Sequence, residues 1–129
     1  MNEAYLAENG YANSTQSTAN NRGIEYQVFA RITRQLAYDD KKAADYHPKI
    51  SEALHNNLKL WTLLATDVAN DNNELPADLR SSLFYLAEFT RQHTAKIYAG
   101  EANPKVLVDI NTMVMRGLRG TGAAQESEA

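Results

Sequence analysis

Histidines are the side chains in this sequence best suited to metal or proton chemistry, and there are three of them. His47 and His55 are eight residues apart. On a helix that spacing is about 12 Å along the axis, which is too far for the two rings to share one metal ion unaided. No HExxH motif occurs. His93 lies in the segment RQHT beside an apolar helix stripe, where a structural or surface role is favoured over a binding role.

Carboxylates, glycines and cysteines give no catalytic constellation either. The acidic residues are scattered, in turn segments such as Asp39 and Asp71 or singly on helices such as Glu88, and a solvated surface is the simplest interpretation. Gly117 and Gly120 lack the preceding strand and the Lys-Ser or Lys-Thr of a phosphate-binding loop, so we predict that they end a helix. The chain has no cysteine. We therefore expect a protein that is not an enzyme, with no catalytic residues, no cofactor and no metal.

The charge balance argues against general nucleic-acid binding. Lysine and arginine total 13 and aspartate and glutamate total 16, which gives a formal charge of -3 and a pI near 5.6. A protein that neutralises phosphates needs the opposite sign, so direct nucleic-acid binding is not expected. The first residues resemble no secretory signal, and no apolar run approaches the ~18 residues of a membrane span. We expect a soluble, cytoplasmic protein without membrane insertion.

The apolar residues that must form the core are concentrated in the middle of the chain. Leu, Ile, Val and Phe account for 26 of the 129 residues, and 25 of these lie between residues 24 and 118. A polar first segment and a small, acidic last segment cannot bury comparable surface. We therefore predict a flexible arm over residues 1–21, a helical domain over residues 22–118 and a disordered acidic tail over residues 119–129.

Four apolar stripes at helical spacing predict four helices. The first stripe covers residues 24–36 and the second runs from Pro48 to the polar turn at residues 70–73. The third stripe begins at Pro76, in the first turn, and carries Leu79, Leu83, Leu86, Thr90 and Ile97 before Gly100. The fourth opens at Asn103 and Pro104, with Leu107, Ile110, Met113 or Val114, and Leu118 inward. We predict an all-α fold, a single small four-helix bundle-like domain.

Aromatic side chains exceed what one inward helix face needs. The third helix adds three of them to its leucine stripe: Phe84, Tyr85 and Phe89. Either this helix is the surrounded centre of the bundle, or one face meets a partner. Trp61 beside Leu60 raises the same question in the second helix, and Tyr26 and Phe29 offer the other side of a pocket. The residues themselves indicate a small interaction domain with an apolar groove suited to an amphipathic helix.

Five sequence blocks, taken together, resemble one protein family. They are RGIEYQVFARITRQL at 22–36, NLKLW at 57–61, LPADLR at 75–80, FYLAEFTRQHT at 84–94 and LVDINTMVMRGL at 107–118. In this order and spacing they resemble the FlaF family of flagellar biosynthesis regulators of alphaproteobacteria. The resemblance covers about residues 22–118.

The resemblance implies a non-enzymatic role in bacterial flagellum biogenesis and motility. It implies that the protein binds monomeric flagellin before export, controls flagellin synthesis and acts as a flagellin secretion or assembly chaperone, with FlbT as a second candidate partner. The alternative is a translational regulator that contacts flagellin messenger RNA directly or together with FlbT. Apolar motif positions are expected in the core: Leu60, Trp61, Leu86, Ile110 and Leu118. Polar motif positions are expected either in buried hydrogen bonds or in partner contact: Arg91, His93, Thr94 and Asn111. The candidate partner-binding residues are Tyr26, Phe29, Trp61, Tyr85, Phe89, Arg91, His93 and Asn111.

Overall fold

The structure is a computed structural model that describes the backbone of residues 18–128 and the side chains of residues 26–117. The described residues form four helices: α2 (Thr18–Leu36), α3 (Tyr46–Ala69), α4 (Ala77–Tyr98) and α5 (Lys105–Glu128). The predicted all-α fold with four packed helices is confirmed. Residues 1–17, which make up most of the predicted arm, lie outside the described residues.

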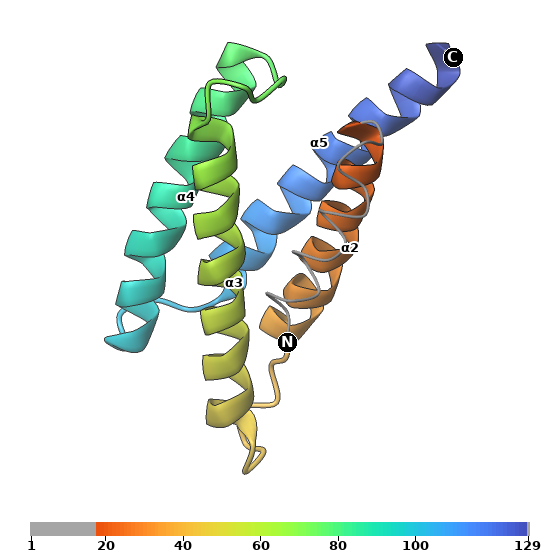
Figure 1. Ribbon diagram of the computed structural model, residues 1–129. Helices are drawn as coiled ribbons and strands as arrows, with labels where there is room; N and C mark the ends of the chain where they lie inside the picture. The colour runs from red at the N-terminus through yellow and green to blue at the C-terminus, as the bar shows by residue number, and fades with distance from the viewer. Residues whose placement is uncertain (1–17, 129) are drawn as a thin grey trace.

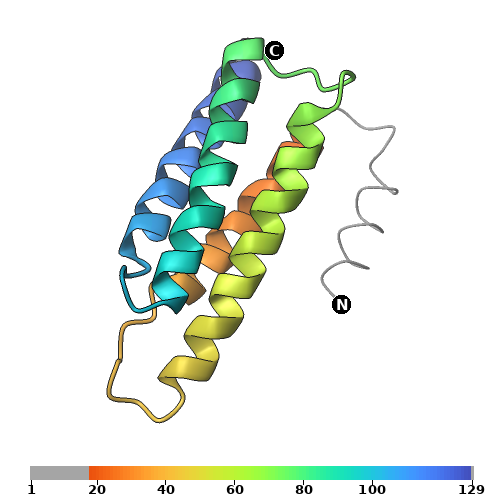
Figure 2. The same cartoon turned by 90° about the vertical axis from the view of Figure 1, so that its left-hand side faces the viewer.

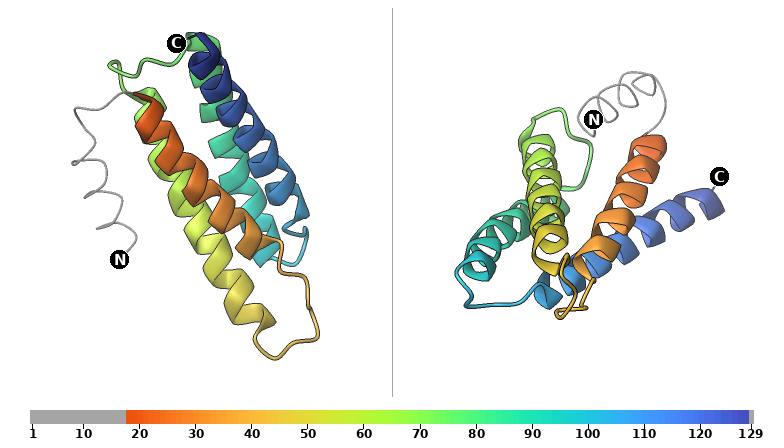
Figure 3. Two further views of the ribbon diagram at one scale, coloured as in Figure 1. Left: turned by 90° about the vertical axis from the view of Figure 1, so that its right-hand side faces the viewer. Right: turned by 90° about the horizontal axis from the view of Figure 1, so that it is seen from below.

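The helices run alternately up and down, and they are not equally close to one another (Figure 1). α2 packs against both α3 and α5, and α3 packs side by side with the antiparallel α4 (Figure 2). α4 and α5 make the fewest contacts of these pairs. The view from below shows α5 beside α2 and turned away from α4 (Figure 3). The bundle is therefore closed along three helix pairs and open along the fourth.

Polar turn chemistry ends α3 where the sequence predicts. Asn70 Oδ1 accepts a hydrogen bond from the Asn72 backbone N–H at 2.8 Å, and Asn73 Oδ1 accepts one from the Leu75 N–H at 3.0 Å. These side chains occupy backbone donors that a continuing helix would use. Pro48 lies in the first turn of α3, as predicted, whereas Pro76 lies one position before the first residue of α4.

The turn between α4 and α5 also follows the predicted signals. Gly100 has a φ of 77°, a left-handed conformation that favours glycine, and its N–H donates to the Ile97 carbonyl oxygen at 3.0 Å. Asn103 Oδ1 accepts a hydrogen bond from the Lys105 N–H at 3.0 Å and so caps α5. The predicted helix stop at Gly100 and the cap at Asn103 are confirmed.

One predicted helix end is wrong, and one helix begins earlier than its apolar stripe. α5 does not stop at Gly117 or Gly120 but continues to Glu128. A glycine inside a helix costs only about 1 kcal/mol relative to alanine, so glycine ends a helix where the backbone must turn, as at Gly100, and merely weakens it elsewhere. α2 begins at Thr18, six residues before the first stripe residue Ile24 and inside the segment assigned to the arm.

All four helices contribute to one core. Trp61 is fully buried, and its ring meets that of Phe29 edge to face, with the centroids 5.6 Å apart and an angle of 86° between the planes. Leu86 and Ile110 are half-buried against this core, whereas the side chain of Leu118 lies outside the described residues. Of the fourth-stripe alternatives, Val114 is buried and Met113 is exposed. Five polar residues are buried as well: Thr33, Asn57, Thr90, Thr94 and Asn111.

Candidate partner-binding site

The eight candidate residues do not form one surface in this structure. Phe29, Trp61 and Asn111 are fully buried inside the bundle, and Tyr26 is half-buried on α2. The other four lie on α4, where two are exposed and two are half-buried: Tyr85, Arg91, Phe89 and His93. A surface for a partner can therefore use the α4 residues without opening the core.

The buried candidates are joined by hydrogen bonds rather than presented to solvent. Trp61 Nε1 donates to Asn111 Oδ1 at 2.9 Å, and Asn111 Nδ2 donates to Asn57 Oδ1 at 2.8 Å. Sequence reasoning did not single out Asn57. Its position four residues before Trp61, on the apolar stripe of α3, is the signal that marks it as a buried polar residue.

Helix α4 exposes three of its four aromatic side chains. Tyr85 is 69% exposed and Phe84 is 52% exposed, and Tyr98 is exposed as well. The alternative that this helix is the surrounded centre of the bundle is therefore wrong. Tyr85 and Phe89 lie four residues apart and so on the same side of the helix.

One flank of α4 points away from α3. On this flank the rings of Phe89 and His93 stack, with their centroids 5.5 Å apart and 13° between their planes. His93 Nε2 lies 3.2 Å from the Asn103 carbonyl oxygen. Because a carbonyl oxygen only accepts, Nε2 must carry the proton in this contact. His93 thereby links this flank to the turn that leads into α5.

Helix α5 carries a matching row of apolar residues on its flank away from α2. Val106 and Met113 are exposed and Ile110 is half-buried between them. The neighbouring residue Val108 belongs to the other flank, because it lines a cleft together with Leu36 of α2. We call the six residues on the two open flanks the α4–α5 face: Tyr85, Phe89, His93, Val106, Ile110 and Met113.

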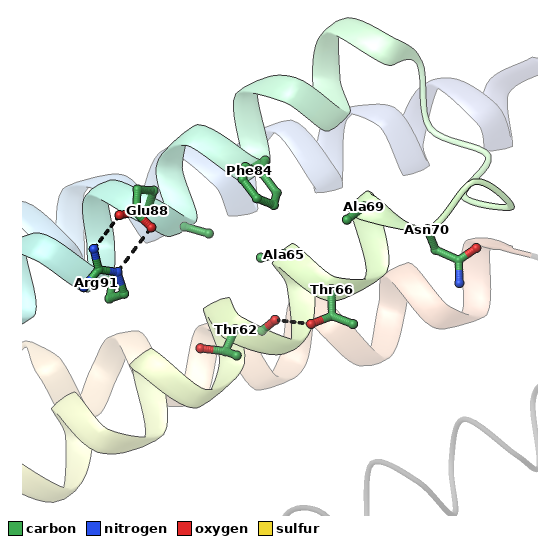
Figure 4. A pocket seen from close by; sticks show the side chains of 9 residues that line it. Thr62, Ala65, Thr66, Ala69, Asn70, Phe84, Glu88 and Arg91 are labelled. Atoms are coloured by element: carbon green, nitrogen blue, oxygen red, sulfur yellow. Dashed lines mark hydrogen bonds and ion pairs between the residues drawn. The ribbon is translucent and has the colours of Figure 1, made fainter.

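A second hollow lies on the other flank of α4, between α3 and α4 (Figure 4). It has a volume of about 490 Å³. α3 contributes small side chains, Thr62, Ala65, Thr66 and Ala69, with Asn70 at its end. α4 contributes Phe84, Ala87, Glu88 and Arg91. Sequence reasoning did not find this groove. Its signal is the helical spacing of the small residues on α3, which leaves room beside Phe84.

The charged residues at one end of this groove neutralise each other. Arg91 donates hydrogen bonds to both carboxylate oxygens of Glu88, and Gln92 Nε2 donates one at 3.2 Å. These bonds hold the pKa of the Glu88 carboxyl group below its ordinary value and raise the pKa of Arg91. Arg91, a candidate contact residue, therefore presents a paired rather than a free charge.

A third cleft, of about 480 Å³, lies between α2 and α3. It has more basic lining residues than the cleft beside Val108 or the hollow between α3 and α4. Arg31, Arg34 and Lys49 line it, together with Glu52. Lys49 Nζ pairs with Asp45 at 2.9 Å and lies 4.9 Å from the centre of a tyrosine ring. Part of the positive charge of this cleft is thus already balanced.

The part of the chain that the structure describes holds no metal-ligand cluster and no membrane-spanning helix. No group of three histidine, cysteine, aspartate or glutamate side chains within it is arranged to hold a metal ion. Glu52 and His55 are three residues apart on α3, but both are exposed and no third ligand joins them. None of the described helices is long and apolar enough to cross a membrane.

Comparison with protein families identifies the chain. The family model described as flagellar protein FlaF matches residues 7–118, so it begins fifteen residues before the first block that carries the resemblance. Comparisons with curated proteins and with solved structures give no significant match. Because the family model covers most of the 129 residues, the chain belongs to the FlaF family of flagellar proteins.

Proposed function

We propose that this protein binds flagellin monomers before their export, and that through this binding it acts as a flagellin chaperone and as a regulator of flagellin synthesis. Membership of the FlaF family supports a flagellar role. The exposed aromatic residues of α4 support a role in protein binding, which needs no catalytic residue.

The uneven distribution of exposed apolar side chains is the observation that carries this proposal. Among the residues with described side chains, seven large apolar residues are exposed. Four are on α4 and two on α5, and the described part of α2 has none: Leu79, Phe84, Tyr85 and Tyr98, then Val106 and Met113. Three of these six belong to the α4–α5 face, namely Tyr85, Val106 and Met113, and the other three lie elsewhere on α4. Single exposed apolar residues are ordinary, but a set gathered on neighbouring elements marks an interaction surface.

An amphipathic helix is the partner that the α4–α5 face would fit. Its apolar positions form two rows, Tyr85 and Phe89 on α4 and Val106, Ile110 and Met113 on α5. A helix laid along these rows would cover both with side chains at positions i, i+3 or i+4, and i+7. A flagellin chaperone must cover apolar helices that flagellin otherwise buries only in the filament, and such a face would serve that purpose.

Direct binding of flagellin messenger RNA, alone or together with FlbT, is the alternative. The cleft between α2 and α3 favours it, because Arg31, Arg34 and Lys49 line one hollow. Against it, Lys49 is paired with Asp45 and the whole chain carries a formal charge of -3. Since RNA affinity rests largely on phosphate neutralisation, we place protein binding first.

Titration of the purified full chain with flagellin monomer tests the proposal. The decisive variant replaces Tyr85 and Phe89 with serine. Buried aromatic anchors are each worth about 2 kcal/mol or more, so losing two should weaken flagellin binding by about a thousandfold. Phe84→Ser is the matched control, because it removes an aromatic ring from the opposite flank of the same helix.

The controls separate loss of contact from loss of fold. Tyr85→Ser alone removes the most exposed ring and leaves half-buried Phe89 in place, so it should keep the helical circular dichroism spectrum and still lose affinity. A folded double variant that binds flagellin as tightly as the parent would contradict the proposed face. Binding to leader RNA that falls steeply with salt, without flagellin binding, would favour the alternative.

A further inference from the structure

A directed series of hydrogen bonds runs across the core from α3 to α5 and back to α3. Trp61 Nε1 donates to Asn111, and Asn111 Nδ2 donates to Asn57 Oδ1. An indole N–H can only donate, so it fixes which end of the Asn111 amide faces Trp61. That orientation in turn fixes the orientation of the Asn57 amide, whose NH₂ group is the last donor in this series of hydrogen bonds.

This last donor is buried without an acceptor. Asn57 is fully buried, and its Nδ2 has no hydrogen-bond partner among the residues whose side chains the structure describes. A buried polar group in that position loses its contacts with water and gains nothing in exchange. The Asn57 amide cannot be turned over to avoid this, because Asn111 needs its oxygen as acceptor.

Thr90 on α4 holds a second buried polar atom without a partner, its Oγ1. Six threonines with described side chains lie in helices, and five of them donate to the carbonyl oxygen one turn earlier: Thr33, Thr62, Thr66, Thr94 and Thr112. Thr90 is the exception. Its hydroxyl group, fully buried like Asn57, is therefore available for a contact across the core.

Asn57 and Thr90 lie at the same level of the antiparallel pair α3 and α4. Two hydrogen bonds near the ends of the helices fix the register: Tyr98 Oη to the Ser51 carbonyl oxygen (3.4 Å) and Arg80 Nε to the Val68 carbonyl oxygen (2.9 Å). Counted from the first bond, Asn57 is six residues from Ser51 on α3 and Thr90 is eight residues from Tyr98 on α4. Counted from the second bond, Asn57 is eleven residues from Val68 on α3 and Thr90 is ten residues from Arg80 on α4. At 1.5 Å per residue the two differ by at most about 3 Å in height.

We propose that Asn57 Nδ2 and Thr90 Oγ1 bind one buried water molecule between them. Water is the smallest molecule that accepts from the amide NH₂ and donates to the hydroxyl oxygen at once. Buried waters typically make about three hydrogen bonds to groups that would otherwise be unsatisfied. With the water in place the chain of hydrogen bonds runs from Trp61 through Asn111, Asn57 and the water to Thr90.

The consequence concerns α4, which makes few contacts with α5. The bridged chain ties α4 to Asn111 of α5 through the core, and so fixes the rotation of α4 about its axis. Thr90 directly follows Phe89, so the same rotation decides how far Tyr85 and Phe89 turn outward. The water site is thus a positioning element for the exposed side of α4, and it stands whether or not that side binds flagellin.

The test uses the full-length protein and two kinds of measurement. A crystal structure that resolves ordered water should show density within hydrogen-bond distance of both atoms. Because Trp61 is the only tryptophan, its indole N–H gives one resonance. Thr90→Val, which keeps the shape and removes the hydroxyl, should shift that resonance and speed its hydrogen exchange at least tenfold. Thr90→Ser should keep exchange near the parent rate.

Thr94→Val is the matched control, because it removes a buried hydroxyl one turn away that donates to a backbone carbonyl oxygen. It should leave the indole exchange rate within about twofold of the parent. The proposal is overturned if the map shows Thr90 donating to a carbonyl like the other threonines with no density beside Asn57, or if Thr90→Val and Thr94→Val have equal effects. If Thr90→Val does not fold, the parent map decides alone.

Discussion

Replacement of Trp61 by alanine should remove a large share of the free energy of unfolding. Trp61 is fully buried and packs edge to face on Phe29, and a Trp→Ala change in such a site costs about 3 to 5 kcal/mol. The change also removes the donor to Asn111 Oδ1, and an unsatisfied buried acceptor costs about 1 to 3 kcal/mol more. The sum of about 4 to 8 kcal/mol compares with a total stability of about 5 to 15 kcal/mol for a domain of this kind.

Trp61→Phe separates the two terms, because it keeps an aromatic ring and loses the N–H donor. Trp61→Phe should lower the free energy of unfolding less than Trp61→Ala does, because phenylalanine leaves a smaller cavity than alanine. Urea unfolding followed by far-ultraviolet circular dichroism gives both values without relying on the tryptophan signal. Leu63→Ala, at an exposed position on the same helix, is the control and should stay within about 0.5 kcal/mol of the parent. A Trp61→Ala variant within about 0.5 kcal/mol of the parent, the range of a surface change, would refute the assignment of Trp61 to the core.

Other predictions follow from the backbone and the surface charges. Gly117→Ala should raise the free energy of unfolding by about 0.5 to 1 kcal/mol, because a Cβ there meets nothing within 4 Å, whereas Gly100→Ala should lower it because φ is 77°; thermal melts compare the two. Hydrogen bonds from Lys49 and then Tyr38 lower the pKa of Asp45, so this exposed cluster stabilises the folded chain at neutral pH and loses that effect as pH falls below about 4. The same contact raises the pKa of Tyr38, so its contribution is lost as pH rises above about 10. In thermal melts measured across pH, Asp45→Asn should reduce both the loss of stability at acidic pH and the loss at alkaline pH. If both losses are unchanged, the Asp45 contacts do not contribute to stability.

The features that the sequence predicted well are those that depend on neighbouring residues in the chain. Asn103 caps α5 and Gly100 ends α4 because their own side chain or backbone conformation meets a local need. The polar run after α3 ends that helix for the same reason. The aliphatic stripes likewise predicted the helices correctly, since burial of one face is a periodic and therefore readable property.

The features that the sequence could not predict depend on neighbours far along the chain. Gly117 and Gly100 are the same residue type, yet Gly100 occupies a turn and Gly117 lies inside α5. Trp61 and Asn111 suited either the core or a contact surface, and only the packing of α5 against the bundle places them inside. The buried role of Asn57 depends on its hydrogen bond with Asn111, which lies more than fifty positions further along the chain.

The composition of its two sides makes α4 unlike the other helices, and this difference bears on what the protein does. Three of its four buried residues are small or polar, namely Ala87, Thr90 and Thr94, and Leu83 is the one large apolar side chain among them, while three of its aromatic rings are exposed. A helix selected only for stability would bury its rings, since each contributes more apolar surface than an alanine or threonine. Departures from this rule are expected where function opposes stability. We therefore propose that α4 is the element where the fold gives up core packing to keep an apolar surface available to a partner.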